Sequence, residues 1–293
     1  MVYTSIGDRI MQNAVLFYFS GTGNTWWVSR NVVRRLQEKG IAARAYSVER
    51  IAHEEACRLL TDNDAAGFGY PIYGSDLPQP MKDFIRCLPV FEGKKCFVFC
   101  TQWLWSGDGA RTGADFLKPK GFDVQWGEHF LMPNNVCIGA IPLPFTNDRS
   151  KLDPILARAS HRINRFADKI VSGHSYLWGF NLLSYLLGCM QRVPFRRMQQ
   201  HLRDNMRVDP DRCTRCGYCA RLCPSGNLVF DGESLRTRNR CVYCMRCYNF
   251  CPESAITHRG RPHNLRRGVP YRGPVKAFDP KILRPTHTPN SVL

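Results

Sequence analysis

The chain contains two runs of cysteines whose spacing suits metal coordination. Each run reads C-x2-C-x2-C-x3-C-P; the first begins at Cys213 and the second, 28 residues later, begins at Cys241. Three thiolates at this pitch lie on one tight loop and can cap one face of an iron–sulfur cube, while the fourth is held at a different angle. Zinc is the alternative, but zinc sites use paired C-x2-C units that are usually separated by a dozen or more residues. The two quartets therefore favour iron–sulfur clusters.

The segment between the runs adds a second signal. Asp231-Gly232 predicts a hairpin turn between short strands at 228–230 and 234–236. With this hairpin and the repeated motif, residues 206–260 resemble the bacterial two-cluster ferredoxin domain. The resemblance implies that the fourth cysteine of each run ligates the cluster of the other run. One [4Fe–4S] cluster would be held by Cys213, Cys216, Cys219 and Cys251, and the other by Cys241, Cys244, Cys247 and Cys223.

A glycine-containing turn near the other end of the chain is the second candidate site. It lies between an apolar run at 14–19, which predicts a buried strand, and helical spacing over 25–36. Such a turn points backbone N–H groups and a helix N-terminus at an anion. It lacks both the third glycine of the dinucleotide fingerprint and the Gly-Lys-Ser/Thr of the P-loop. The turn therefore predicts a phosphate cradle without a cation, formed by Ser20, Gly21, Thr22, Gly23, Asn24 and Thr25.

The elements that must position this cradle alternate along the chain. Further strands are predicted at 41–46, 65–70, 95–100 and 123–132, and helices lie between them, including 80–88 and 153–171. This alternation predicts an α/β fold with a doubly wound parallel sheet in the order 2-1-3-4-5. The cradle and the alternation make residues 12–173 resemble flavodoxins, which implies FMN as the bound phosphate ligand.

The flavodoxin resemblance also implies contacts to the flavin ring. In that family the loops after the strands hold the isoalloxazine, often between aromatic side chains, which stack well on a flat ring. The corresponding loops here follow the third, fourth and fifth predicted strands. The candidates are Pro71, Ile72, Tyr73, Gly74, Thr101, Gln102, Trp103, Trp105, Gly107, Asp108, Asn134 and Asn135.

A connector at 174–205 separates the two predicted domains. Residues 176–190 are almost entirely apolar, but as a helix they would span roughly 22 Å, which is shorter than the ~30 Å hydrocarbon core of a bilayer. Two interpretations remain open. The segment packs between the domains, or it forms an interfacial helix or partner-docking surface that the following arginines anchor on anionic lipid.

The charge of the chain is strongly uneven. The net charge is +17, and residues 174–293 hold 20 lysines and arginines against 7 acidic residues. The tail at 261–293 is rich in arginine, proline and glycine, and it is either a solvated extension or a docking patch for an acidic redox partner. Nucleic acid is a poor candidate partner, because no recognition motif accompanies the charge.

The chain as a whole resembles the flavodoxin–ferredoxin fusion proteins of anaerobic bacteria and archaea. This resemblance implies an electron-transfer protein that passes low-potential electrons between two [4Fe–4S] clusters and FMN. The alternative is an FMN-dependent reductase that reduces a substrate or quinone at the flavin. A third hypothesis is a membrane-peripheral subunit of a larger redox complex, docked through residues 176–190. No catalytic acid–base constellation is visible. The sequence shows no signal peptide and no run of about 18 apolar residues, so a cytoplasmic location is expected.

Overall fold

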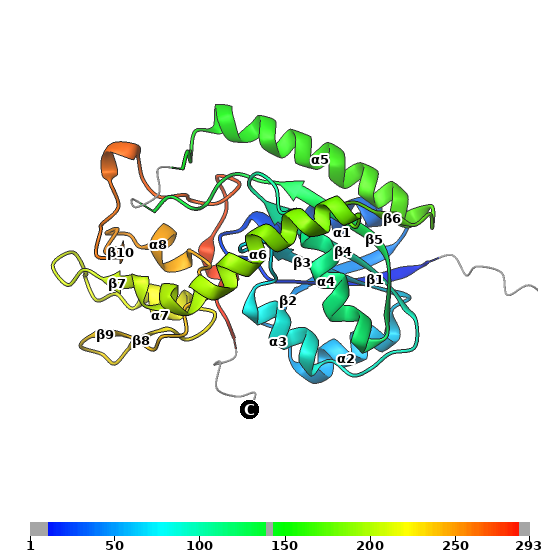
Figure 1. Cartoon of the computed structure of the whole chain (residues 1–293), viewed down its shortest axis with the longest axis horizontal. Coiled ribbons are helices and arrows are strands. Elements are labelled where there is room, and N and C mark those ends of the chain that lie inside the picture. Colours follow the sequence, from blue (N-terminus) through cyan, green and yellow to red (C-terminus); the bar gives the residue numbers. More distant parts are fainter. Residues whose placement is uncertain (1–10, 139–142, 287–293) are drawn as a thin grey trace, which may run out of the picture.

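A parallel sheet forms the centre of the larger domain in the computed structural model, which describes residues 11–138 and 143–286 (Figure 1). All neighbouring strands in this sheet are parallel. The strands lie in the order β2 (Ala42–Ser47), β1 (Asn13–Tyr18), β3 (Ala65–Pro71), β4 (Lys94–Gln102), β5 (Phe122–Leu131) and β6 (Tyr176–Leu177). The predicted doubly wound fold is confirmed, and β6 extends the sheet beyond residue 173.

Helices cover both faces of this sheet (Figure 1). One face packs against α2 (His53–Asp62), α3 (Gln79–Cys87) and α4 (Gly109–Leu117), and the other against α1 (Asn24–Glu38) and α5 (Arg149–Val171). Every residue of β3 is buried, as expected for a central strand with both faces covered. The carboxyl ends of the strands therefore meet at one rim, where a doubly wound sheet binds its ligands.

The cysteine region is a small α+β unit with internal repetition. It contains β7 (Met206–Val208), α7 (Tyr218–Leu222), β8 (Leu228–Phe230), β9 (Leu235–Thr237), α8 (Arg246–Phe250) and β10 (Ile256–His258). β7 pairs with β10, and β8 pairs with β9 as the predicted hairpin. Left-handed backbone conformations recur 28 residues apart at Arg215 and Tyr243, Gly217 and Met245, and Gly226 and Ser254. The two cysteine loops thus share one backbone shape.

The connector and the tail join the two units. The long helix α6 (Leu182–Leu202) begins after Asn181, whose side chain accepts a hydrogen bond from the Ser184 amide, and runs from the sheet rim toward the cysteine region (Figure 1). Tyr271, Phe278 and Leu283 of the tail are buried, so this part of the chain is not a solvated extension. Short 3-10 turns lie at η1 (Lys118–Lys120), η2 (Arg203–Asn205), η3 (Leu265–Arg267) and η4 (Pro280–Leu283). Over the described residues, no helix combines the length and apolarity needed to cross a bilayer.

A fully buried guanidinium holds these units together. Arg246, at the start of α8, pairs with the buried carboxylate of Glu49 from the loop after β2. The guanidinium also donates to four backbone carbonyl oxygens, those of Ser20, Gly21, Leu222 and Leu283. Since burying a charge is costly unless it is paired and hydrogen-bonded, this complete set of acceptors is what makes the position of Arg246 tolerable.

Removing the carboxylate of Glu49 should strongly destabilise the chain. In Glu49→Ala the Arg246 charge stays buried without its partner, which we expect to lower the free energy of unfolding by about 3–5 kcal/mol. Urea denaturation followed by circular dichroism measures this difference. The matched control is Glu38→Ala, which removes a half-exposed carboxylate paired with Arg35 on the surface of α1 and should cost less than about 0.5 kcal/mol. Equal losses in the two variants would contradict the role given to the buried pair.

Candidate cofactor site

The turn between β1 and α1 is buried, and its side chains hold the turn in shape. The Ser20 hydroxyl accepts hydrogen bonds from the amides of Gly23 and Trp26. The Thr25 hydroxyl lies 2.8 Å from that of Thr101 at the end of β4, and Thr22 accepts from the Asn135 side chain at 2.8 Å. Asn24 donates to the Pro133 carbonyl and accepts from the buried Tyr271 hydroxyl. The Ser20 and Thr22 hydroxyls therefore act as acceptors within the protein, and each keeps its own O–H group as a donor.

The backbone of the same turn remains available to an anion. The amides of Gly21, Thr22, Asn24 and Thr25 have no acceptor among the described residues, and Asn24 and Thr25 belong to the first turn of α1. Amides of this kind at a helix N-terminus suit a phosphate. Gly23 has a φ of 101°, a conformation that glycine adopts without strain. The turn therefore fits the phosphate cradle predicted from the sequence, with backbone amides as well as the Ser20 and Thr22 hydroxyls as its donors.

The hydroxyl of Tyr73 points at this turn, and no protein group forms a hydrogen bond with it among the described residues. A Cβ added at Gly21 would lie 2.6 Å from the Tyr73 Oη and 2.8 Å from the carbonyl oxygen of Cys244, so glycine is required there. The Tyr73 Oη is buried and has no hydrogen-bond partner among the described residues. Burial raises the pKa of Tyr73 well above its ordinary value, so the group keeps its proton. A buried donor left unpaired is costly, which suits a site that a ligand completes.

The structure sorts the eight cysteines of the two runs into two neighbouring quartets. Cys219 lies within electrostatic range of Cys251, Cys213 and Cys216, and these four line one pocket. Cys247 lies within range of Cys241, Cys244 and Cys223, and also of Cys219 in the other quartet. This grouping coincides with the crossed sets that the ferredoxin resemblance implies.

Hydrogen bonds around the cysteines fit metal-bound thiolates. Backbone amides donate to sulfur at equivalent positions of the repeat, from Asn227 to Cys223 at 3.2 Å and from Ala255 to Cys251 at 3.3 Å. Such hydrogen bonds orient metal-bound thiolates and tune their potential. Within 11–138 and 143–286, no three His, Cys, Asp or Glu side chains converge closely enough to hold one metal ion.

The remaining candidates for flavin contacts have different surroundings at the rim. Tyr73, Thr101 and Asn135 face the turn, whereas Asn134 donates to the Val136 and Pro144 carbonyls of its own loop. Pro71 ends β3, where the Ile72 amide continues the sheet by donating to the Thr101 carbonyl, and Gln102 accepts from Ser106. Gly74, Gly107 and Asp108 are turned to α6 instead. Trp103 is half-buried, and Trp105 is exposed.

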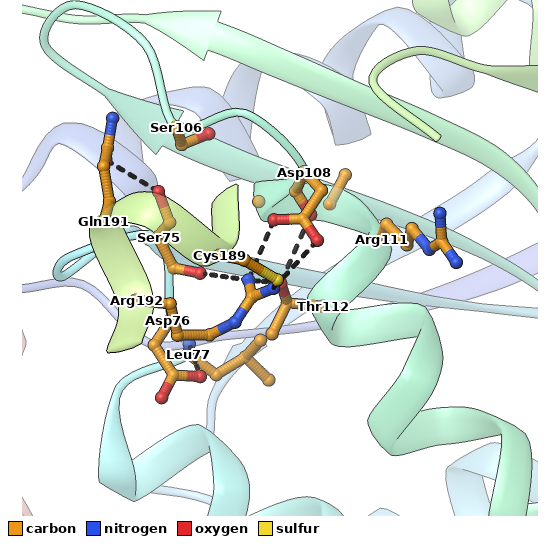
Figure 2. Close-up of polar contacts among 12 residues, drawn as sticks. Ser75, Asp76, Leu77, Ser106, Asp108, Arg111, Thr112, Cys189, Gln191 and Arg192 are labelled. Carbon is orange, nitrogen blue, oxygen red and sulfur yellow. Dashed lines mark hydrogen bonds and ion pairs between the residues drawn. The ribbon is translucent and has the colours of Figure 1, made fainter. Parts of the chain in front are cut away.

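Helix α6 is fixed over this rim by a buried ion pair (Figure 2). Arg192 donates to both carboxylate oxygens of Asp108, at 2.8 and 3.0 Å, and to the Ser75 carbonyl and the Thr112 hydroxyl. Asp76 is buried, which opposes its ionisation, but hydrogen bonds from Arg196 and Lys82 hold its pKa below the ordinary value. The loops after β3 and β4 are thus covered by α6.

Sequence reasoning missed three residues that build the site. Arg246 stands where the first cysteine run has Tyr218, so a mismatch inside an otherwise matched repeat was the available signal. In the sequence, Arg192 is only one of the arginines that follow the apolar residues 176–190, and nothing there marks it as the partner of Asp108. Tyr271, which contacts Asn24 from the far end of the chain, carried no signal, because nothing local marks a residue that folds back over 247 positions.

Known proteins are similar to parts of this chain. Residues 205–252 match the 4Fe-4S dicluster domain family. Among curated proteins, none matches the chain. The flavodoxin of Streptococcus pneumonia TIGR4 is 16% identical and covers 55% of this chain and 99% of its own, with a TM-score of 0.41. The two-electron reduced flavodoxin of Megasphaera elsdenii is 19% identical, with coverages of 53% and 98% and a TM-score of 0.38.

A larger protein is also similar to this chain. The flavodiiron core from Synechocystis sp. PCC6803 is 20% identical over 56% of this chain, with a TM-score of 0.40. The chain spans only 37% of the length of that protein. The strand order 2-1-3-4-5 and the family match at 205–252 define the class: the chain joins a flavodoxin-like fold to a 4Fe-4S dicluster domain.

The unpaired hydroxyl of Tyr73 generates a prediction about ligand binding. Tyr73→Phe removes a buried group that has no partner, so the ligand-free protein should be unchanged or more stable, by up to about 1–3 kcal/mol. The matched control is Tyr70→Phe, because the Tyr70 hydroxyl is buried but donates to Gly109 and Ala110, and its loss should cost about 1 kcal/mol. Urea denaturation measures both changes. Added FMN should stabilise wild type more than Tyr73→Phe, and an equal gain would contradict a hydroxyl that pairs with the ligand.

The buried pair beneath α6 generates a second prediction. Arg192→Met leaves Asp108 buried and unpaired, so α6 should detach locally and its amides should exchange hydrogen at least about tenfold faster. Hydrogen exchange measured by mass spectrometry resolves α6 from the central sheet, which should keep its protection. Arg197→Met is the control, because Arg197 is exposed on the same helix. Unchanged exchange in α6 of Arg192→Met would show that other contacts hold the helix.

Proposed function

We propose that the chain is an electron-transfer protein that binds FMN at the turn between β1 and α1 and two [4Fe–4S] clusters in the cysteine region. When bound, the clusters supply one-electron transfer and FMN supplies one- or two-electron transfer. The main support for this proposal is that the second cysteine loop packs directly on the turn between β1 and α1. The Cys244 carbonyl approaches Gly21, and Arg246 donates to the carbonyls of Ser20 and Gly21.

The two quartets differ in their distance from the flavin turn, which supports an ordered route. Cys244 is buried and packs with the core of the larger domain, whereas Cys216 is exposed. In this proposal the quartet of Cys241, Cys244, Cys247 and Cys223 holds the cluster next to the flavin. The quartet that contains Cys216 holds the outer cluster, where a redox partner exchanges electrons with the chain. Arg246 acts as a positioning residue, because it sets the separation between the turn and the inner quartet.

The cover over the rim favours electron transfer over reduction of a small substrate. The loops after β3 and β4, which flavodoxin-like proteins use around the flavin ring, lie under α6 through Gly74, Gly107 and Asp108. Phe195 of α6 packs where a side chain at Gly74 would lie. A helix fixed by a buried ion pair restricts the approach of a substrate from that side. Electrons that arrive through the cysteine region need no such opening.

Iron content and spectroscopy of reconstituted protein test this function. Wild type should bind about eight iron atoms and one FMN per chain, and anaerobic reduction should give interacting electron paramagnetic resonance signals from two reduced clusters. Cys216→Ala removes a ligand of the outer cluster, so iron should fall to about four atoms with FMN retained and the spin interaction lost.

The control for this experiment is Cys57→Ala, because Cys57 lies on α2 outside both quartets. It should leave the iron content and the spectrum unchanged. Stoichiometric zinc in place of iron would overturn the cluster assignment. FMN that binds nowhere, with both clusters intact, would overturn the flavin assignment alone.

A further inference from the structure

Helix α6 places its polar residues against the protein and its apolar residues toward the outside, which is the reverse of an ordinary surface helix. The face that packs on the larger domain carries Gly188, Arg192 and the half-buried Gln191. The outward face carries Leu182, Leu183, Leu186, Met190 and Val193, and three of these side chains are at least 66% exposed. Leu183, Leu186, Met190 and Val193 are three or four residues apart, and Leu182 is four residues before Leu186, so all five lie on one stripe of the helix. An outward apolar stripe is costly in water, so its presence calls for a covering surface.

The apolar surface is concentrated around this helix. Nine of the sixteen exposed large hydrophobic side chains in the described part of the chain lie between Leu177 and Met198. Trp178 is exposed just before α6, and Leu104 and Trp105 are exposed on the loop that touches α6 at Gly107. Tryptophan is the side chain most typical of the boundary between lipid headgroups and acyl chains, because its ring is apolar with one polar edge.

The charges on the same helix are of one sign. α6 contains no acidic residue, and Arg197 is exposed on the turn that follows the apolar stripe, whereas Arg196 beside it pairs with Asp76. The chain from residue 174 onward holds 20 basic against 7 acidic residues. Exposed arginines beside an apolar face complement anionic lipid headgroups, each adding attraction that salt screens.

We propose that the outward face of α6 is an interfacial anchor that lies in the plane of an anionic membrane surface. The ion pairs of Arg192 and Arg196 hold the helix lengthwise on the domain, so its apolar stripe enters the headgroup boundary without crossing the bilayer. The anchor uses only residues of α6 and its neighbouring loops, and it does not depend on the proposed cofactors. It places the rim of the sheet against the lipid surface.

Flotation with vesicles tests the anchor on the full-length protein with its cofactors bound. Wild type should rise with vesicles of equal parts phosphatidylglycerol and phosphatidylcholine, bind phosphatidylcholine vesicles more weakly, and lose affinity as salt is raised. The double variant Leu183→Glu/Leu186→Glu should bind at least about 100-fold more weakly, since each buried leucine contributes about tenfold. Both leucines are exposed, so the variant should fold normally.

The control is matched in charge and exposure. Val90→Glu/Leu265→Glu adds the same two negative charges at exposed apolar sites outside α6 and should bind vesicles like wild type to within about threefold. Wild type that does not float, or a Leu183→Glu/Leu186→Glu variant that floats like its control, would overturn the proposal. Light scattering tests whether a second copy of the chain covers this face instead. Wild type that self-associates but does not bind vesicles, with self-association lost in Leu183→Glu/Leu186→Glu, would assign the face to a second copy.

Discussion

The placement of one buried positive charge governs how the two halves of this chain fit together. The Arg246 guanidinium is stable in the interior only where an anion and several carbonyl oxygens converge on it. Glu49, the turn after β1, the first cysteine run and the tail supply those groups. Because all of these segments must place an acceptor within hydrogen-bond distance of the Arg246 guanidinium, their positions relative to one another are fixed. That precision is what electron transfer between neighbouring cofactors requires of its protein.

The parts of the structure that local patterns specify were predictable, and the long-range contacts were not. Two identical cysteine spacings and the strand–turn–helix around Gly21 and Gly23 are written in consecutive residues, and they led to the α/β sheet order and the dicluster domain. The Arg246–Glu49 pair spans 197 positions, and the Arg192–Asp108 pair spans 84. An arginine in a basic chain gives no sign of which carboxylate it will reach. The cradle itself was predicted, but which of its groups stay free depends on partners such as Asn135 and Tyr271.

The polarity of α6 shows how one helix serves two surfaces. Its polar face is satisfied by the sheet rim through Arg192 and Asp108, so the apolar residues that a globular protein would bury are left outside. The apolar composition of 176–190 was visible in the sequence, but the direction in which it points was not. Both interpretations of that segment contain part of the arrangement, because α6 packs against the larger domain and still presents an apolar exterior.

The buried tail also bears on the order in which the protein is made. Tyr271, Pro274 and Phe278 close over Asn24 and Gly23, yet they leave the ribosome after every other segment that touches that turn. During synthesis the turn, the sheet and both cysteine runs are complete before this cover exists. The residues of this cover are therefore synthesised after everything else that touches the turn, so the turn stays open until they fold back over it.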